Sequence, residues 1–245
     1  MAPPMYRSAL LSCVGIVALS TGADAQSIGR PLAAPNSGWA GAYAGVLAGA
    51  GFAGNRWTDV GMSGAGWSNP AGTQYNSTPA GATLGLFAGY NWQALPFVVL
   101  GLEADITYNT ARGRANVNPF DPTNVTAHSN FAGSLRARVG FAVDRALIYV
   151  TSGVALGNPS QRWFQPSGAA WKSDGTQVGF VIGAGVEYMV TPQWVIRAEA
   201  MHYDFGSRNA PNITPASSPD SWNTGYLMRA RSSQTQARLG AAYRF

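Results

Sequence analysis

The sequence is short of charged residues, which make up 11% of its 245 residues, against roughly 25% in soluble globular proteins. Lysine occurs once, at Lys172, so arginine carries almost all of the positive charge. The arginines are scattered and form no basic run, which argues against nucleic-acid binding despite a net charge of +5. The chain therefore has too few charged residues for the usual charged surface of a soluble protein, and another property must make it compatible with its solvent.

Cysteine is also nearly absent, and the single residue, Cys13, lies close to the N-terminus. The rest of the chain has no thiol for a disulfide, for nucleophilic catalysis or for zinc coordination by cysteine. It also has no run of 18 apolar residues, so the sequence does not predict a membrane-spanning helix.

The first 25 residues have the three parts of an export signal. Arg7 supplies the positive charge, residues 9–19 form an apolar centre, and Ala23 and Ala25 supply the small residues of a cleavage site. The apolar centre is too short to cross ~30 Å of hydrocarbon as a helix. We therefore expect a cleaved signal peptide at 1–25, a periplasmic N-terminal segment at 26–38 and one barrel domain at 39–245.

The remaining sequence alternates between apolar and polar residues with a period of two, as in strands with one oily face. Residues 100–108 show this clearly, because Leu100, Leu102 and Ile106 alternate with Glu103 and Asp105. Most of the expected strands are long enough for the ~9–11 residues that cross a bilayer at a tilt. The pattern predicts eight strands, at 39–52, 83–93, 100–108, 131–141, 147–157, 178–188, 194–205 and 236–245.

The connections between these segments alternate between long and short. Four long, polar loops are expected at 53–82, 109–129, 158–175 and 206–231, and three tight turns at 94–96, 143–146 and 190–193. Lipid cannot satisfy backbone hydrogen bonds, so a sheet in a bilayer must close on itself. The sequence therefore predicts an all-β, eight-stranded antiparallel up-and-down transmembrane β-barrel, with its loops outside the cell and its turns and both ends in the periplasm.

The polar faces of the strands collect charged residues that this barrel would enclose. A soluble barrel would place its apolar face inside. Here the opposite face of the strands carries arginines and acids, so in a membrane barrel this polar face would be inside and the apolar face would contact lipid. An eight-stranded barrel is just wide enough for side chains to fill it, and charges inside must be paired. We interpret the set as an ion-pair plug, with a polar path for small solutes as the alternative; its members are Glu103, Asp105, Arg136, Arg138, Glu187, Arg197, Glu199, Arg238 and Arg244.

Several short segments resemble a known family. They are Gly-Trp-Ala-Gly-Ala-Tyr-Ala-Gly at 38–45, Gly-Tyr-Asn-Trp-Gln at 89–93, Gly-Leu-Glu-Ala-Asp at 101–105, Val-Glu-Tyr at 186–188 and Ala-Arg-Leu-Gly-Ala-Ala-Tyr-Arg-Phe at 237–245. These segments resemble the small porin-like outer-membrane proteins of alphaproteobacteria, which include surface antigens, immunogenic proteins and haemin-binding proteins. The resemblance implies an outer-membrane barrel that is inserted by the barrel-assembly machinery through a terminal aromatic signal, here Tyr243 and Phe245. It implies no catalytic residues.

The function expected from the sequence is that of a structural surface protein with a plugged interior, in contact with outer-membrane lipid and lipopolysaccharide. The alternatives are a narrow porin or binding through the loops. The two histidines, His128 and His202, have no obvious acid on the same face, so we expect no catalysis, metal or cofactor. A haemin site at His128, Tyr75, Trp57 and Trp67 is one form of the binding alternative.

The aromatic residues fall into two groups. We expect one group to form girdles at the two membrane interfaces, namely Trp39, Tyr43, Tyr90, Trp92, Tyr108, Tyr149, Trp194, Tyr203 and Tyr243. Three loop tryptophans, Trp163, Trp171 and Trp222, are expected to pack inside folded loops or to contact lipopolysaccharide.

Overall fold

The computed structural model describes residues 38–61, 72–116, 124–164, 170–217 and 227–245. Within these ranges no helix is long and apolar enough to cross a membrane. The expected signal peptide and nearly all of the expected N-terminal segment lie outside the described residues. The long strands are β1 (Gly41–Gly61), β3 (Ala80–Leu95), β4 (Val98–Asn109), β6 (Asn124–Val143), β7 (Ala146–Phe164), β9 (Gln177–Met189), β10 (Trp194–Ala210) and β11 (Leu227–Arg244). The short strands are β2 (Gln74–Ser77), β5 (Arg112–Asn116) and β8 (Ala170–Ser173).

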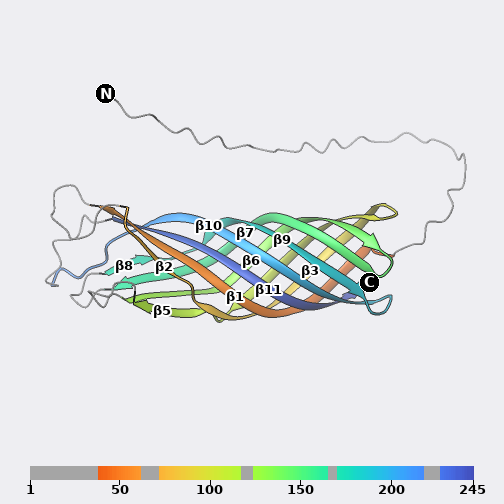
Figure 1. The fold of residues 1–245 in the computed structure, drawn as a ribbon, viewed down its shortest axis with the longest axis horizontal. Helices are drawn as coiled ribbons and strands as arrows, with labels where there is room; N and C mark the ends of the chain where they lie inside the picture. Colours follow the sequence, from red (N-terminus) through yellow and green to blue (C-terminus); the bar gives the residue numbers. More distant parts are fainter. Residues whose placement is uncertain (1–37, 62–71, 117–123, 165–169, 218–226) are drawn as a thin grey trace, which may run out of the picture. The chain divides into compact units, whose positions relative to one another are not determined.

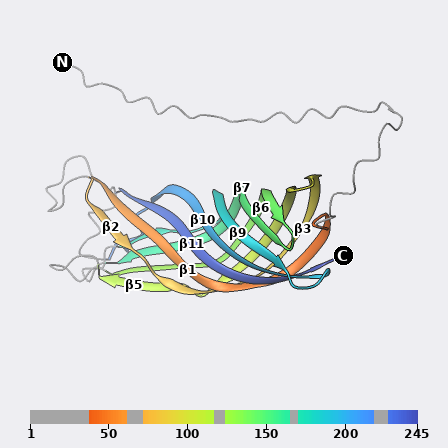
Figure 2. The ribbon, with the colours of Figure 1, turned by 45° about the vertical axis from the view of Figure 1, so that its right-hand side comes forward.

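The eight long strands form a closed antiparallel barrel (Figures 1 and 2). Each pairs with the next long strand along the chain, and β11 pairs back onto β1 over most of its length. Closure leaves the eight long strands with no unpaired edge in the central barrel, as a sheet in lipid requires. The predicted fold class and strand number are therefore confirmed.

Tight connections gather at one end of this barrel, which we call the turn end. The β6–β7 turn consists of Asp144 and Arg145, and Asp144 has a φ of 49°, a left-handed conformation that aspartate tolerates better than most residues. The C-terminus lies at the same end, where the Phe245 amide donates to the Ala42 carbonyl over 3.0 Å (Figure 1). Phe245 therefore lies close to the beginning of β1.

The opposite end, which we call the loop end, differs from the prediction. β1, β6, β7, β10 and β11 run 17 to 21 residues, so they extend well into segments that were expected to be loops. The short strands β2, β5 and β8 pair with β1, β6 and β7 and add to the wall at this end (Figure 1). Outside the apolar zone both faces of a strand can be polar, so the alternation that marks a strand disappears from the sequence.

The two faces of the barrel wall have opposite characters. The outward face of the central barrel carries exposed apolar side chains such as Val46, Leu86, Ile106, Leu135 and Val150, each at least 55% exposed. The inward face carries charged and amide side chains, so the polar face is inside, as in membrane barrels.

The expected aromatic girdles are only partly present. Tyr90, Trp92, Tyr108, Trp194 and Tyr243 face outward and are exposed. The girdle assignment was wrong for the other four, Trp39, Tyr43, Tyr149 and Tyr203, which are buried inside the barrel. Side chains on alternate positions point to opposite faces of a strand, and these four share the inward phase.

Apolar clusters lie inside the barrel on either side of its charged middle. Trp39, Val99, Leu147 and Val195 belong to a cluster toward the turn end. At the loop end, Trp57, Trp163 and Trp171 form a second cluster, in which the rings of Trp57 and Trp163 lie 5.8 Å apart. Two of the three loop tryptophans, Trp163 and Trp171, therefore pack inside the barrel at its loop end. Trp222 lies outside the described residues.

Candidate functional site

Eight of the nine predicted interior charges meet in the middle of the barrel. They lie on β4, β6, β9, β10 and β11, and each is at most 7% exposed. Four are acids and four are arginines, so the cluster has no net formal charge; its members are Glu103, Asp105, Arg136, Arg138, Glu187, Arg197, Glu199 and Arg238. We call this set the charged cluster.

One pair within the charged cluster crosses the barrel. β4 and β10 are four strands apart around an eight-stranded ring, and therefore lie on opposite walls. Arg197 on β10 donates from Nη1 to Glu103 Oε1 over 3.1 Å and from Nη2 to Glu103 Oε2 over 2.8 Å. Two parallel hydrogen bonds of this kind fix both groups in position.

The remaining pairs join neighbouring and more distant strands. Glu103 and Arg136 are directly opposite on β4 and β6 and form an ion pair. Each of the eight charges has an opposite charge within 4.0 Å. Buried charges need such partners, because an isolated one costs several kcal/mol. Further contacts are Arg136 to Asp105 at 2.8 Å, Arg138 to Glu187 at 2.9 Å, Arg197 to Glu187 at 2.5 Å and Arg238 to Glu199 at 2.6 Å.

Three buried tyrosines add hydrogen bonds to this cluster. Tyr43 donates to Glu103 Oε2 over 2.8 Å, Tyr149 donates to Glu199 Oε2 over 2.9 Å, and Tyr203 accepts from Arg238 over 3.0 Å. Sequence reasoning missed these roles, although a signal was present. Tyr149 stands between Ile148 and Val150, which face outward, so its own phase is inward.

The guanidinium groups also pack on aromatic faces. The Arg197 Cζ lies 3.8 Å from the Phe87 ring centre, and the Arg138 Cζ lies 4.3 Å from that of Tyr149. Such contacts attract a cation electrostatically. The aromatic rings thus fill the space beside the arginines.

Glycine lies directly opposite each of the four buried arginines on a neighbouring strand. The register pairs are Arg136 with Gly153, Arg138 with Gly101, Arg197 with Gly240 and Arg238 with Gly49. No side chain fits at two of these positions. A Cβ on Gly153 would lie 2.0 Å from the Leu135 carbonyl oxygen, and one on Gly49 would lie 2.1 Å from the Ala237 carbonyl oxygen. These glycines allow the strands to approach closely beside the long side chains.

The ninth predicted charge, Arg244, lies apart from the cluster at the turn end. It donates to the carbonyls of Pro192 and Ala40, each over 3.3 Å, and its guanidinium lies 5.7 Å from the Trp39 ring centre. The expected assembly residues lie on the outer face beside it. Tyr243 packs edge-on against both Trp194 and Phe245, and Phe245 is 80% exposed.

Of the expected haemin set, Trp57 and Tyr75 are register partners on β1 and β2 and pack in the loop-end cluster. His202 faces outward, and its Nδ1 lies 2.9 Å from Thr235 Oγ1. Trp57 is fully buried in the loop-end cluster, and Tyr75 packs on Trp163 at 4.7 Å between ring centres. Trp67 and the side chain of His128 lie outside the described part.

The sequence also identifies the family to which the chain belongs. Residues 11–245 match the model of the outer membrane protein beta-barrel domain. The chain belongs to this family. The outer-membrane β-barrel is accordingly located in the outer membrane of a Gram-negative bacterium.

Relatives of this outer-membrane β-barrel are named as immunogenic surface proteins. The chain is 32% identical over 196 residues to a 31 kDa outer-membrane immunogenic protein of Brucella melitensis, covering 75% of this chain and 79% of that protein. It is 28% identical over 212 residues to a 25 kDa outer-membrane immunogenic protein of Brucella abortus, covering 86% and 82%. These are alphaproteobacterial surface antigens, as the resemblance implied.

Among solved structures, the outer membrane protein OprG of Pseudomonas aeruginosa has the same fold. The two chains share a TM-score of 0.53 at 12% identity, over 84% of this chain and 96% of OprG. At this identity the likeness concerns the fold of the barrel alone.

Proposed function

We propose that the protein is a closed surface barrel, which holds its loop end at the cell surface and does not conduct solutes. The observation that carries the proposal is the Glu103–Arg197 pair, which joins opposite walls through two hydrogen bonds. Water-filled pores need a continuous polar path, whereas this lumen is occupied by paired charges between apolar clusters.

The charged cluster is better suited to closing the barrel than to stabilising it. Buried ion pairs gain little net free energy, because desolvation offsets much of their attraction. Four acids and four arginines balance one another, so the cluster attracts no excess of either ion. A selective channel would instead present charge of one sign to its solute.

The orientation is part of this proposal. Long loops of outer-membrane barrels face outside the cell and short turns face the periplasm, so the loop end is placed outside. The outward Tyr243 and Phe245 at the turn end would then be presented to the barrel-assembly machinery during insertion, and the exposed apolar wall would contact lipid.

Planar-bilayer conductance of the purified protein tests the proposal. The wild type should insert without stepwise openings. A variant with Glu103→Ser and Arg197→Ser should open measurably, since it shortens both side chains that cross the lumen while leaving the remaining charges balanced. Trp92→Ser, on the outer face, serves as the matched control and should be silent. Stepwise openings of the wild type would favour the narrow-porin alternative.

A further inference from the structure

The outer wall changes from apolar to polar toward the loop end, along β1 and β11. Val46 and Phe52 on β1 are exposed and apolar, whereas the next outward positions are Gly54 and Arg56. On β11 the outward positions change in the same way, from Leu239 to residues 235, 233, 231 and 229, which are Thr, Ser, Arg and Arg. The polar part therefore begins where the exposed wall would leave the hydrocarbon.

Two arginines face each other in this polar part. Arg56 and Arg231 are register partners on the antiparallel strands β1 and β11, and both side chains are exposed on the outer face. Side chains in such pairs stand about 4.5–5.5 Å apart at Cβ, and like charges there repel. Arg229 adds a third exposed cation two residues along β11.

Only part of this positive charge is neutralised by the protein. Asp204 Oδ2 lies 2.5 Å from Arg231 Nη2. Arg56 donates from Nε to the neutral Asn76 Oδ1 over 3.2 Å, and within the described ranges neither it nor Arg229 forms an ion pair with a carboxylate. The facing pair thus lacks one negative charge, which an external anion could supply.

The surface between these arginines is hollowed. A depression of about 470 Å³ has Gly54 and Ser233 in its wall, with Arg56, Asn76, His202, Asp204 and Arg231 around them. Gly54 and Ser233 are register partners, so two small residues face each other beside the facing cations. The depression is large enough for a phosphate group and part of a sugar, and the side chains around it supply hydrogen-bond donors.

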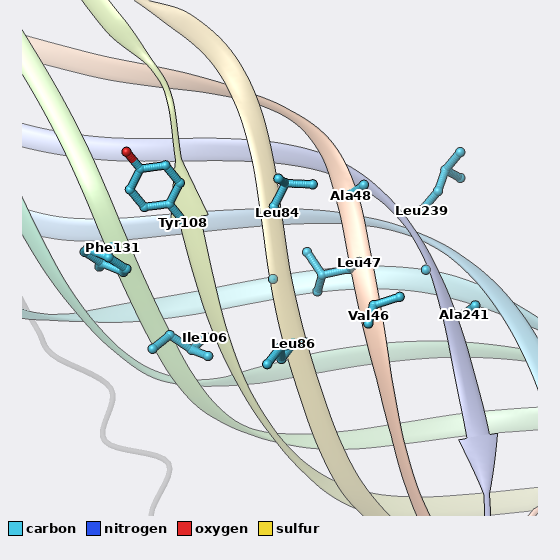
Figure 3. Close-up of a pocket in the computed structure, with 12 residues that line it drawn as sticks. Val46, Leu47, Ala48, Leu84, Leu86, Ile106, Tyr108, Phe131, Leu239 and Ala241 are labelled. Atoms are coloured by element: carbon cyan, nitrogen blue, oxygen red, sulfur yellow. The ribbon is translucent and has the colours of Figure 1, made fainter.

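An apolar groove lies farther down the same two strands. Val46 and Ala48 on β1 and Leu239 and Ala241 on β11 line it, together with Leu84 and Leu86 on β3 (Figure 3). About six residues of β1 separate the groove from the depression, or on the order of 20 Å along the strand at 3.3 Å per residue. One wall therefore presents an anion-binding head site and an apolar track.

We propose that this wall binds a membrane lipid with a phosphorylated sugar headgroup, whose phosphate lies between Arg56 and Arg231 and whose acyl chains lie in the groove. The inference rests on the proposed orientation, which places the loop end and this site in the outer leaflet. A soluble anion would match the two cations but would make no use of the apolar track below them.

Binding of bisphosphorylated lipid A to detergent-purified protein, measured by native mass spectrometry, tests the proposal. The variant with Arg56→Gln and Arg231→Gln should lose about tenfold in affinity, the order expected for two exposed charge-assisted contacts. Arg162→Gln is the matched control, because Arg162 is an exposed arginine on β7, on the opposite side of the barrel. Asp204→Asn should bind about threefold more tightly, since it releases Arg231 for the ligand.

Three outcomes would overturn the inference. They are unchanged affinity in the double variant, an equal loss in Arg162→Gln, and equal binding of the same lipid after its phosphates are removed. A sulfated oligosaccharide that depends on Arg56 and Arg231 while lipid A does not would assign the site to a soluble polyanion instead. Bilayer conductance of the purified protein and surface labelling of intact cells report separately on the proposed function, so the two failures are distinguishable.

Discussion

Arg197 on β10 holds both carboxylate oxygens of Glu103 on the opposite wall, at 3.1 and 2.8 Å. This contact turns two separate charges into a bridge across the lumen. Glu103 also contacts Arg136 and Arg138, and Arg197 also contacts Glu187, so the bridge is the centre of a larger network.

Tyr43→Phe should destabilise the barrel, because it removes the donor to Glu103 and an acceptor for Arg138. We expect a loss of about 1–3 kcal/mol in the free energy of unfolding, measured with urea in lipid vesicles. Tyr90→Phe is the matched control on the outer face and should change stability by less than about 0.5 kcal/mol. Equal effects would mean that Tyr43 is not inside the barrel.

Gly153→Ala should impair folding, since the added Cβ would lie 2.0 Å from the Leu135 carbonyl oxygen and 2.7 Å from the Arg136 Cα. Backbone must move to accommodate it, and overpacking of this kind costs about 1–3 kcal/mol. At Gly133, which faces outward, the added Cβ would lie 3.4 Å from its nearest neighbour, so Gly133→Ala should fold normally. Urea unfolding of both variants checks this, and a tolerated Gly153→Ala would contradict the close approach of β6 and β7.

The sequence predicted the strands and the inward charges because strand phase is a local property. Leu102 and Glu103 must face opposite sides whatever the rest of the fold does. The contact between Glu103 and Arg197 could not be predicted in this way, because it joins side chains from opposite walls and depends on barrel diameter and stagger. Their sequence separation of 94 residues carries no such information.

The loop end was beyond sequence reasoning for a different physical reason. Residues such as Trp57 and Trp163 lie on strands that continue past the apolar zone, where each face mixes polar and apolar residues. Without alternation, these segments have the composition of loops. Their strand character comes from pairing with neighbours that are already in register, such as Trp57 with Ala230.

Surface labelling tests the orientation. A cysteine at Ser217, which is exposed between β10 and β11, should react with a membrane-impermeant maleimide on intact cells. A cysteine at Arg145, in the β6–β7 turn, should react only after permeabilisation. Both are placed in a Cys13→Ser background. Labelling of the Arg145 position on intact cells would reverse the proposed topology.

Phe245→Ala should reduce the amount of protein inserted in the outer membrane, because Phe245 is the outward aromatic residue at the end of the chain. Phe97→Ala provides a control, since Phe97 is also an exposed aromatic residue at the turn end but lies in the β3–β4 turn. Quantification of both variants in outer-membrane fractions should show a severalfold loss for Phe245→Ala alone. Equal yields would exclude a terminal signal at Phe245.

A double-mutant cycle on Glu103 and Arg197 tests the closed lumen most directly. Glu103→Gln should lower the free energy of unfolding by about 3–5 kcal/mol, because it removes the carboxylate that three buried arginines share and leaves an excess of buried positive charge. A surface control, Asp174→Asn, should leave the urea midpoint unchanged, although a hydrogen bond from Lys172 lowers the pKa of Asp174 from its ordinary value.

Arg197→Met should be similarly costly, and the double variant should recover part of the combined loss. We expect a coupling energy of about 2 kcal/mol, as for residues in one network. Additive losses, within about 0.5 kcal/mol, would mean that water separates the two side chains, and would contradict a lumen closed by this pair.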